Sequence, residues 1–131
     1  MGDVKALAVA RTLVDGDLMG HDTFGLALLP GYIREIENAA MACSGEPEIV
    51  SDRGAGLLWD GRRLPGPWLV LSGIKTIAPR AREIGSATLV IRRSHHIGCL
   101  AAAPRNVRCS DAEQLRNGVA LYPTHRLAES N

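Results

Sequence analysis

The sequence predicts an α/β (α+β) fold: a helical N-terminal part, residues 1–45, followed by the start of a mixed α/β domain, residues 46–103. Two observations support this class. Apolar residues recur at helical spacing through the N-terminal part, and the continuous apolar run at residues 87–91 is typical of a buried strand. Residues 104–131 have weak periodicity and a polar end, so we expect a divergent, poorly ordered tail.

The composition is typical of a single domain. Hydrophobic residues make up 46% of the 131 residues, which is enough for a modest core. A net charge of +1 with scattered arginines argues against a nucleic-acid partner. No apolar run could span a bilayer or serve as a signal peptide. The cysteines, Cys43, Cys99 and Cys109, match no zinc spacing, so we expect a cytoplasmic protein with free thiols and no membrane contact.

Two helices are predicted in the N-terminal part. The first covers residues 4–18, with Asp3 as its expected N-cap. One face of this helix carries Leu7, Ala10, Val14 and Leu18. A second apolar stripe consists of Leu26, Leu29, Ile33, Ile36 and Ala40. Pro30 interrupts it early, so the helix either kinks there or begins with Pro30 in its first turn. Both stripes are expected to face the core or a dimer surface.

The mixed domain is predicted to begin with short strands at residues 48–51 and 56–59, separated by a turn. A third helix follows at residues 67–84. Pro79 inside it removes a backbone donor at a cost of roughly 3 kcal/mol, so we expect a kink or break there. Gly85 is placed to end the helix, and the buried strand follows at residues 86–92. A weaker helix candidate, interrupted by Gly118, covers residues 110–121.

Polar residues gather at the end of the buried strand and again far upstream. The strand is followed by residues 94–98 (SHHIG), and residues 20–23 (GHDT) precede the second apolar stripe. Strand ends commonly carry reactive groups in α/β proteins, and histidine exchanges a proton near neutral pH. If the fold brings the two segments together, they form a pocket. Asp22 or Thr23 could instead cap the following helix.

Each candidate also has a structural interpretation. His96 could be satisfied by the backbone at a strand end, without a chemical role. His95 is expected to be structural, because successive strand residues point to opposite faces, which also argues against a histidine pair binding metal. His96 and Cys99 supply only two ligands, so no metal site is predicted. Arg92 and Arg93 fit a solvated strand end, with a phosphate or carboxylate contact as the alternative.

Two segments resemble the type 2 malate/L-lactate dehydrogenase family, which includes ureidoglycolate and sulfolactate dehydrogenases. Residues 16–23 (GDLMGHDT), with the following Gly25-Leu26 and residues 29–32 (LPGY), are similar to the family's N-terminal signature. Residues 90–98 (VIRRSHHIG) resemble its strand followed by a His-x-Gly element. The resemblance covers roughly residues 4–102, and nothing after Ala103 resembles the family.

The resemblance implies a non-Rossmann oxidoreductase that uses NAD or NADP, acts on a small 2-hydroxy or 2-oxo acid, and forms a homodimer. The absence of a Gly-x-Gly-x-x-Gly segment agrees with this. By position, the resemblance assigns His96 as the catalytic proton donor or acceptor toward the substrate oxygen. It places Thr23 near the substrate. It assigns no cofactor-binding residue in this chain and no metal.

The departures from the family pattern are also informative. A histidine usually follows the position of Thr23, but here it is Phe24, which we expect in the core. Leu28 stands where many members have an arginine suited to a substrate carboxylate. Family enzymes are much longer, so we expect a truncated copy with little activity alone. The alternatives are a non-catalytic remnant acting as a dimerisation or interaction module, and a chain whose strand at residues 86–92 lacks partners.

Overall fold

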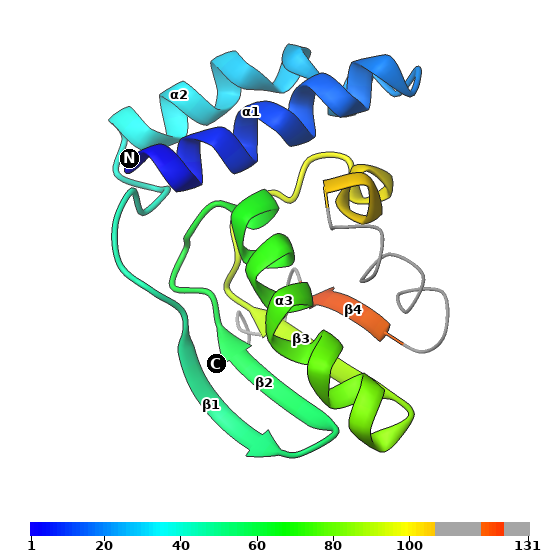
Figure 1. The fold of residues 1–131 in the computed structure, drawn as a ribbon. Helices are drawn as coiled ribbons and strands as arrows, with labels where there is room; N and C mark the ends of the chain where they lie inside the picture. The colour runs from blue at the N-terminus through cyan, green and yellow to red at the C-terminus, as the bar shows by residue number, and fades with distance from the viewer. Residues whose placement is uncertain (107–118, 125–131) are drawn as a thin grey trace.

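The computed structural model of the chain describes residues 1–106 and 119–124, and it confirms the predicted class: helices followed by a small mixed sheet (Figure 1). The elements in chain order are α1 Asp3–Leu18, η1 Asp22–Phe24, η2 Leu26–Leu28, α2 Leu29–Glu37, β1 Glu48–Arg53, β2 Gly56–Asp60, α3 Gly66–Ile84, β3 Ala87–Arg92, η3 Leu100–Asn106 and β4 Val119–Thr124, where η denotes a 3-10 helix. The helices α1 and α2 lie side by side beyond the C-terminal ends of β2 and β3 (Figure 1).

The sheet has the strand order β1-β2-β3-β4. The strands β1 and β2 form an antiparallel hairpin, whose turn places Gly54 at φ +71°, a conformation that favours glycine. The strand β3 runs parallel to β2 on one side and to β4 on the other. The expectation that this strand lacks partners is therefore wrong, because strands on both sides satisfy its backbone.

The strand β4 corrects the expectation of a helix at residues 110–121. Residues 107–118 lie outside the described part, but residues 119–121 belong to β4, which pairs with β3 from Ala87↔Val119 to Arg92↔Thr124. Valine and tyrosine, both present in this segment, favour strands, so pairing with an existing strand outweighs a weak helical pattern.

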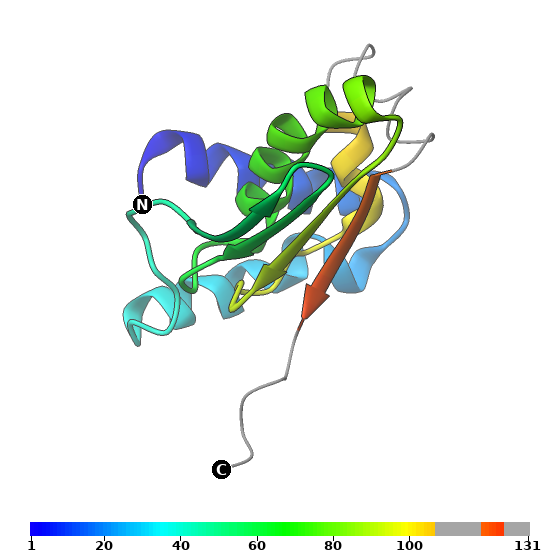
Figure 2. The same cartoon turned by 90° about the horizontal axis from the view of Figure 1, so that it is seen from below.

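The helix α3 covers one face of the sheet (Figure 2). The core between them consists mainly of Leu57, Trp59, Leu69, Ile77 and Leu89, each at most 5% exposed. At Gly73 an added Cβ would lie 2.4 Å from Cδ2 of Leu89, so glycine permits this close helix–sheet approach.

Pro79 does not break α3, which runs from Gly66 to Ile84. The predicted break is wrong because tertiary packing outweighs the local cost of the proline. Ile77 and Ala78 are almost fully buried, and Ala81 packs against the same core on the other side of the proline. Burying each large aliphatic side chain contributes roughly 1.5–3 kcal/mol. Gly85 ends the helix at φ +97°, as predicted.

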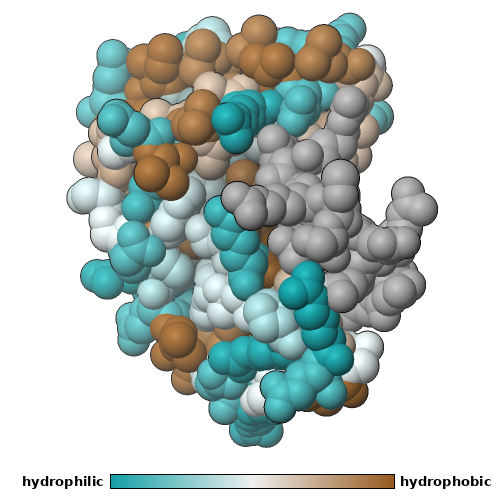
Figure 3. Space-filling view, in the orientation of Figure 1, coloured by the Kyte–Doolittle hydropathy of each residue, from teal (hydrophilic) through white to brown (hydrophobic). Residues whose placement is uncertain are grey.

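Of the two alternatives for the apolar stripe of α1, the core or a dimer surface, the structure excludes the core. Leu7, Val14 and Leu18 are 50%, 42% and 73% exposed, and an apolar band covers α1 and α2 in Figure 3. The buried side of α1 carries Ala8, Val9, Thr12, Leu13 and Gly16. This face packs inward because it includes small residues: an added Cβ at residue 16 would lie 2.9 Å from the carbonyl oxygen of Phe24.

The stripe on the second helix is also largely exposed, and only Tyr32 is buried on α2. Pro30 lies in the first turn of α2, so the helix begins there rather than kinking.

The predicted cap of α1 is wrong, since Gly2 occupies the N-cap and Asp3 lies in the first turn. Within residues 1–106 and 119–124, no helix is both long and apolar enough to cross a membrane.

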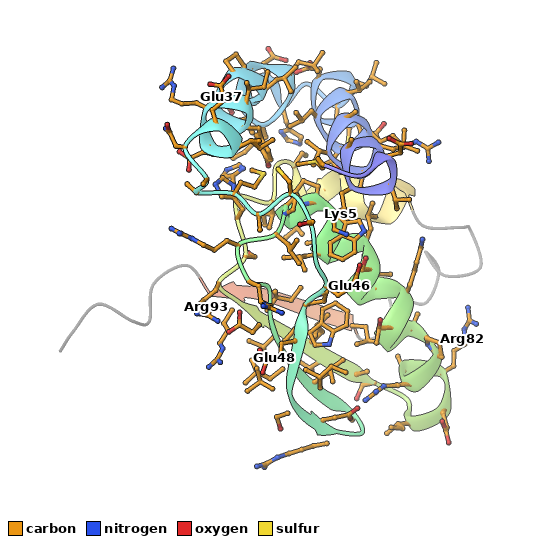
Figure 4. All side chains as sticks on the ribbon, turned by 90° about the vertical axis from the view of Figure 1, so that its left-hand side faces the viewer. Lys5, Glu37, Glu46, Glu48, Arg82 and Arg93 are labelled. Atoms are coloured by element: carbon orange, nitrogen blue, oxygen red, sulfur yellow. The ribbon has the colours of Figure 1, made fainter. Side chains whose placement is uncertain are left out.

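A lysine of α1 joins the helical part to the mixed domain. The Lys5 ammonium lies 3.4 Å from Oε1 of Glu46 and 4.0 Å from the ring centroid of Trp68 in α3 (Figure 4). The carboxylate is exposed, so that ion pair contributes little. The contact with the indole ring is the more favourable of the two, because Trp68 is 8% exposed and partly shields it from water.

Candidate active site

The segment that carries His96 continues the pairing of β2 and β3 beyond the ends of both strands. Backbone N–H groups at residues 61 and 63 donate to carbonyls at residues 92 and 93, and the N–H of His95 donates to the carbonyl of Leu64 at 3.1 Å. Residues 92–95 are therefore fixed by main-chain hydrogen bonds. They deliver His96 in a defined position after the sheet ends.

Gly66, the first residue of α3, packs directly against this segment. An added Cβ would lie 2.5 Å from the carbonyl oxygen of His96, 2.6 Å from that of His95 and 2.7 Å from Cα of Ile97. All three neighbours are main-chain atoms, so no side-chain rotation could make room. Glycine at this position allows the N-terminus of α3 and the histidine segment to lie in contact.

Tyr32 also holds His96 in place. The Tyr32 side chain comes from α2 and is 4% exposed. Its hydroxyl donates to the carbonyl oxygen of His96 at 2.8 Å, and the hydroxyl oxygen lies 3.4 Å from Nδ1 of the His96 ring. The two rings meet edge to face at a centroid distance of 6.2 Å. Burial raises the pKa of the Tyr32 hydroxyl far above its ordinary value, so the hydroxyl stays protonated.

A second contact to Nδ1 influences the tautomer of His96. The backbone N–H of Gly98 donates to Nδ1 at 3.0 Å. An N–H donor requires a lone pair on Nδ1, so this contact favours the neutral form of the ring with its proton on Nε2. Gly98 adopts φ +66°, a conformation that favours glycine.

Phe24 of η1 faces the same imidazole. Its ring is stacked on that of His96, with centroids 6.4 Å apart and planes 10° apart. Phe24 is 46% exposed, so the expectation that it lies in the core is wrong. The short helix η1 has no buried residue, and the ring covers the histidine rather than entering the interior.

Thr23 precedes Phe24 on η1 and is exposed. The fold thus brings the upstream polar segment to His96 through Phe24. The predicted capping role of Asp22 or Thr23 is wrong, because the N-caps of η1, η2 and α2 are His21, Gly25 and Leu28. A carboxylate of α1 takes part of that role: Oδ2 of Asp17 accepts from the N–H of Leu26 at 3.1 Å.

The side chain of His95 contacts two residues of α2. Its Nε2 lies 3.4 Å from Oε2 of Glu35, and its ring centroid lies 5.9 Å from that of Tyr32. Its Nδ1 is buried and has no hydrogen-bond partner among the described residues. In the part of the chain that the structure describes, no group of three histidine, cysteine or acidic side chains could hold a metal ion.

Arg92 and Arg93 both bond to Asp60 at the end of β2. Asp60 is fully buried; its carboxylate accepts from Nε of Arg92 at 3.0 Å, from Nε of Arg93 at 2.8 Å and from the N–H of Arg62 at 2.9 Å. Burial alone would raise the pKa of Asp60, but the bonds from Arg93, Arg62 and Arg92 outweigh it and lower that pKa. The arginines are therefore anchored as well as solvated, and the carboxylate that they contact is Asp60 of the chain itself.

Three residues of this arginine cluster have a strained backbone. Arg62, Arg63 and Arg93 adopt φ values of 49°, 60° and 51°, which cost non-glycine residues energy. Arg93 reaches out beside Glu48 of β1 (Figure 4), whose charge adds to that of Asp60 in raising the pKa of Arg93. Hydrogen bonding to Asp60 is the larger cause of that shift. The carboxylate of Asp60 thus compensates for a costly local conformation.

The N-terminus of α3 is not available to a dinucleotide phosphate. The unit β2-α3-β3 is parallel, and in such units a phosphate often binds where the helix begins. Here the main chain of residues 95–97 fills that position against Gly66. The described residues therefore do not fit a nicotinamide dinucleotide at this place, and none of them is assigned to the cofactor.

The fold is similar to that of solved dehydrogenases. The structure of a putative malate/lactate dehydrogenase from E. coli matches with a TM-score of 0.75 and 26% identity, over 85% of this chain and 30% of that one. Residues 2–111 match the sequence model of the malate/L-lactate dehydrogenase family, and the chain belongs to this family. The match extends past Ala103, which corrects the expectation that the resemblance ends there.

Curated relatives agree with this assignment. Hydroxycarboxylate dehydrogenase B of Escherichia coli O157:H7 is 30% identical over 94 residues, covering 72% of this chain and 26% of the relative. L-lactate dehydrogenase of Cupriavidus necator is 31% identical over 90 residues, covering 69% and 26%. The chain thus spans about a quarter of the length of these relatives.

Proposed function

We propose that the chain supplies the acid/base part of an NAD- or NADP-dependent dehydrogenase acting on small 2-hydroxy or 2-oxo acids of the malate and lactate kind. Membership of the malate/L-lactate dehydrogenase family supports the reaction class. The relatives named above are a hydroxycarboxylate and a lactate dehydrogenase, which supports the substrate class. Assays with NAD⁺ and with NADP⁺ determine which of the two is preferred.

The position of His96 carries this proposal. A hydroxyl group becomes a carbonyl only if its proton leaves, and an imidazole within hydrogen-bond reach is suited to take it. Tyr32 and Gly98 both contact the Nδ1 side of the ring. We therefore assign Nε2 as the nitrogen that exchanges the proton with the substrate oxygen.

Thr23 is proposed to contact the substrate. Its support is local: Thr23 is exposed and adjoins Phe24, whose ring covers His96. The carboxylate clamp that the family resemblance would place at residue 28 is absent here, because Leu28 packs against the apolar cluster around Leu13 and Tyr32. Thr23 is the residue of η1 that carries a hydroxyl group.

Turnover of malate and lactate with NAD⁺ and NADP⁺ tests the proposal. We expect little or no activity from the 131-residue chain alone, because its described residues hold no dinucleotide site at α3. The decisive comparison therefore also uses a chimera, in which residues 2–111 replace the matching segment of the E. coli hydroxycarboxylate dehydrogenase B.

In that chimera His96→Gln should lower kcat/KM by about 100-fold or more, the usual effect of losing a general acid/base. His95→Gln is the matched control, since it removes the neighbouring imidazole, and it should retain most activity. Equal activity of the His96→Gln chimera and its parent would contradict the role of His96.

The alternative of a non-catalytic interaction module is not favoured, because the relatives named above are dehydrogenases. The homodimer that the family resemblance implies is kept as a proposal. Its support is the exposed apolar side of α1, which includes Val4 and Leu7. Sedimentation equilibrium should then give twice the chain mass of 14.0 kDa, and Leu7→Glu should shift the protein toward the single-chain mass.

A cytoplasmic location is likewise a proposal. Cys43 and Cys99 are free thiols, and Cys99 is buried as a small hydrophobe. Fractionation of cells producing the tagged chain tests this, and recovery from a secreted or periplasmic fraction would contradict it.

A further inference from the structure

We propose that Tyr32 is a positioning residue that controls which nitrogen of the His96 ring carries the proton. This inference rests on the proposed function, because it concerns the acid/base form of His96. The observation behind it is that one tyrosine oxygen contacts both the main chain and the ring of the same histidine.

The hydroxyl proton of Tyr32 is committed to the carbonyl of His96. A carbonyl oxygen can only accept, and the 2.8 Å distance is that of a good hydrogen bond. The hydroxyl has one proton, so toward Nδ1 at 3.4 Å its oxygen presents a lone pair. Tyr32 can therefore accept a hydrogen bond from Nδ1–H while it bonds to the carbonyl, but it cannot donate to Nδ1.

Nδ1 thus has two neighbours with opposite requirements. The N–H of Gly98 at 3.0 Å requires a lone pair on Nδ1 and favours the proton on Nε2. The Tyr32 oxygen favours the proton on Nδ1, in the neutral ring and in the imidazolium alike. With the proton on Nδ1, Nε2 presents a lone pair, which is the form that a base toward a substrate hydroxyl requires. Tyr32 therefore stabilises the form of His96 that accepts a proton.

Among the described residues, the contacts of the His96 ring come from a few elements only. The helix α2 brings Tyr32 and Glu35, and Glu35 pairs with His95 at 3.4 Å. The element η1 brings Phe24, and α3 brings Gly66, neither of which titrates. Removing the Tyr32 oxygen should consequently change the tautomer ratio of His96 more than removing the Phe24 ring.

Nitrogen NMR of the chain labelled with ¹⁵N-histidine measures this directly, without turnover. In Tyr32→Phe the averaged shifts of the neutral His96 ring should move toward the pure Nε2–H form, with a change in tautomer ratio of about fivefold, as for one modest hydrogen bond. The pKa of His96 should fall as well, because the imidazolium loses an acceptor at Nδ1. Phe24→Leu is the control, since it removes a stacked ring but no hydrogen bond, and it should leave the tautomer ratio unchanged.

A second measurement guards against misfolding of the phenylalanine variant. Incorporating 3-fluorotyrosine, with the other tyrosine removed by Tyr122→Phe, keeps the hydroxyl but weakens its oxygen as an acceptor. It should shift the His96 tautomer in the same direction by a smaller amount. Unchanged tautomer ratio and pKa with fluorotyrosine would overturn the proposal and leave Tyr32 as a structural anchor only. Failure of the proposed function would instead appear in the turnover of His96→Gln and would not alter these spectra.

Discussion

The hydroxyl of Tyr32 donates a hydrogen bond to the carbonyl oxygen of His96, although the two residues are 64 positions apart in the sequence. This bond joins α2 to the segment that follows β3. The position of His96 therefore depends on the helical part of the chain as well as on the sheet. Changes in either part should be detectable at the same imidazole.

Loss of this bond should destabilise the fold. Tyr32→Phe keeps the buried ring but leaves the carbonyl of His96 without this donor, so the free energy of unfolding should fall by about 1–2 kcal/mol. Urea unfolding measures the difference. Ile33→Ala, at an exposed position of the same helix, should change stability by less than about 0.5 kcal/mol. An equal loss in both variants would mean that the hydroxyl contributes nothing specific.

Because Gly66 lies in contact with residues 95–97, adding a single methyl group at this position should lower the free energy of unfolding. Gly66→Ala places a Cβ 2.5 Å from the carbonyl oxygen of His96, and the resulting shift should cost about 2–3 kcal/mol. The amide resonances of residues 95–97 should move. Gly31→Ala in α2 is the matched control, because an added Cβ there meets nothing within 4 Å, and it should be neutral or stabilising by up to about 1 kcal/mol.

Asp60 should make stability depend on pH in the acid range. Its pKa is lowered in the folded chain, so it contributes stability above the ordinary aspartate pKa of 3.8, and that stability is lost as pH falls through the lower folded value. Asp60→Asn should lose about 2 kcal/mol near pH 7 and show a weaker dependence between pH 5 and 2. Unfolding free energies across this range measure both effects.

Asp52 provides the control for that experiment. It pairs with Arg80 through two hydrogen bonds of 2.5 and 2.7 Å, but this pair lies at the surface. Solvent screens such pairs, so Asp52→Asn should have the smaller effect. If both substitutions gave the same loss, burial of the Asp60 carboxylate would not be the source of its contribution.

Phe24 should limit the polarity of the site. Phe24→His places a second imidazole where the aromatic ring now faces His96, and it introduces the residue that the family resemblance implies at this position. One added hydrogen bond to substrate should raise kcat/KM of the chimera by about tenfold. Phe24→Leu, which adds no polar group, should give no gain. A gain from leucine as large as that from histidine would show that the benefit comes from space alone.

Local patterns predicted most elements but not the faces they bury. The bounds of α1 and α3, the stop at Gly85 and the strand β3 follow from periodicity and glycine placement, which act within a few residues. The side of α1 that faces the core could not be chosen from the sequence, because Leu7 and Leu18 are as apolar as the residues that pack inward. The close contact between Gly16 and the main chain of Phe24 determines which side of α1 packs inward. That contact forms only in the folded chain.

In the candidate site, too, local sequence predicted some features, while others depend on contacts between distant residues. His96 was singled out by its place after a strand, and the upstream segment does reach it. The roles of Tyr32 and Asp60 could not be predicted, because their partners lie 64 and 32 positions away. Pro79 likewise looked like a break because the packing of Ile77 on the sheet has no local signal.

The contact at Gly66 also constrains how the chain could recover from a mutation. Where a large side chain causes a clash, a smaller neighbour elsewhere can usually restore the fit. Here the opposing atoms are the backbone of residues 95–97, which no amino-acid replacement can make smaller. A screen for second-site suppressors of Gly66→Ala should therefore return true revertants at codon 66 rather than compensating changes at the histidines.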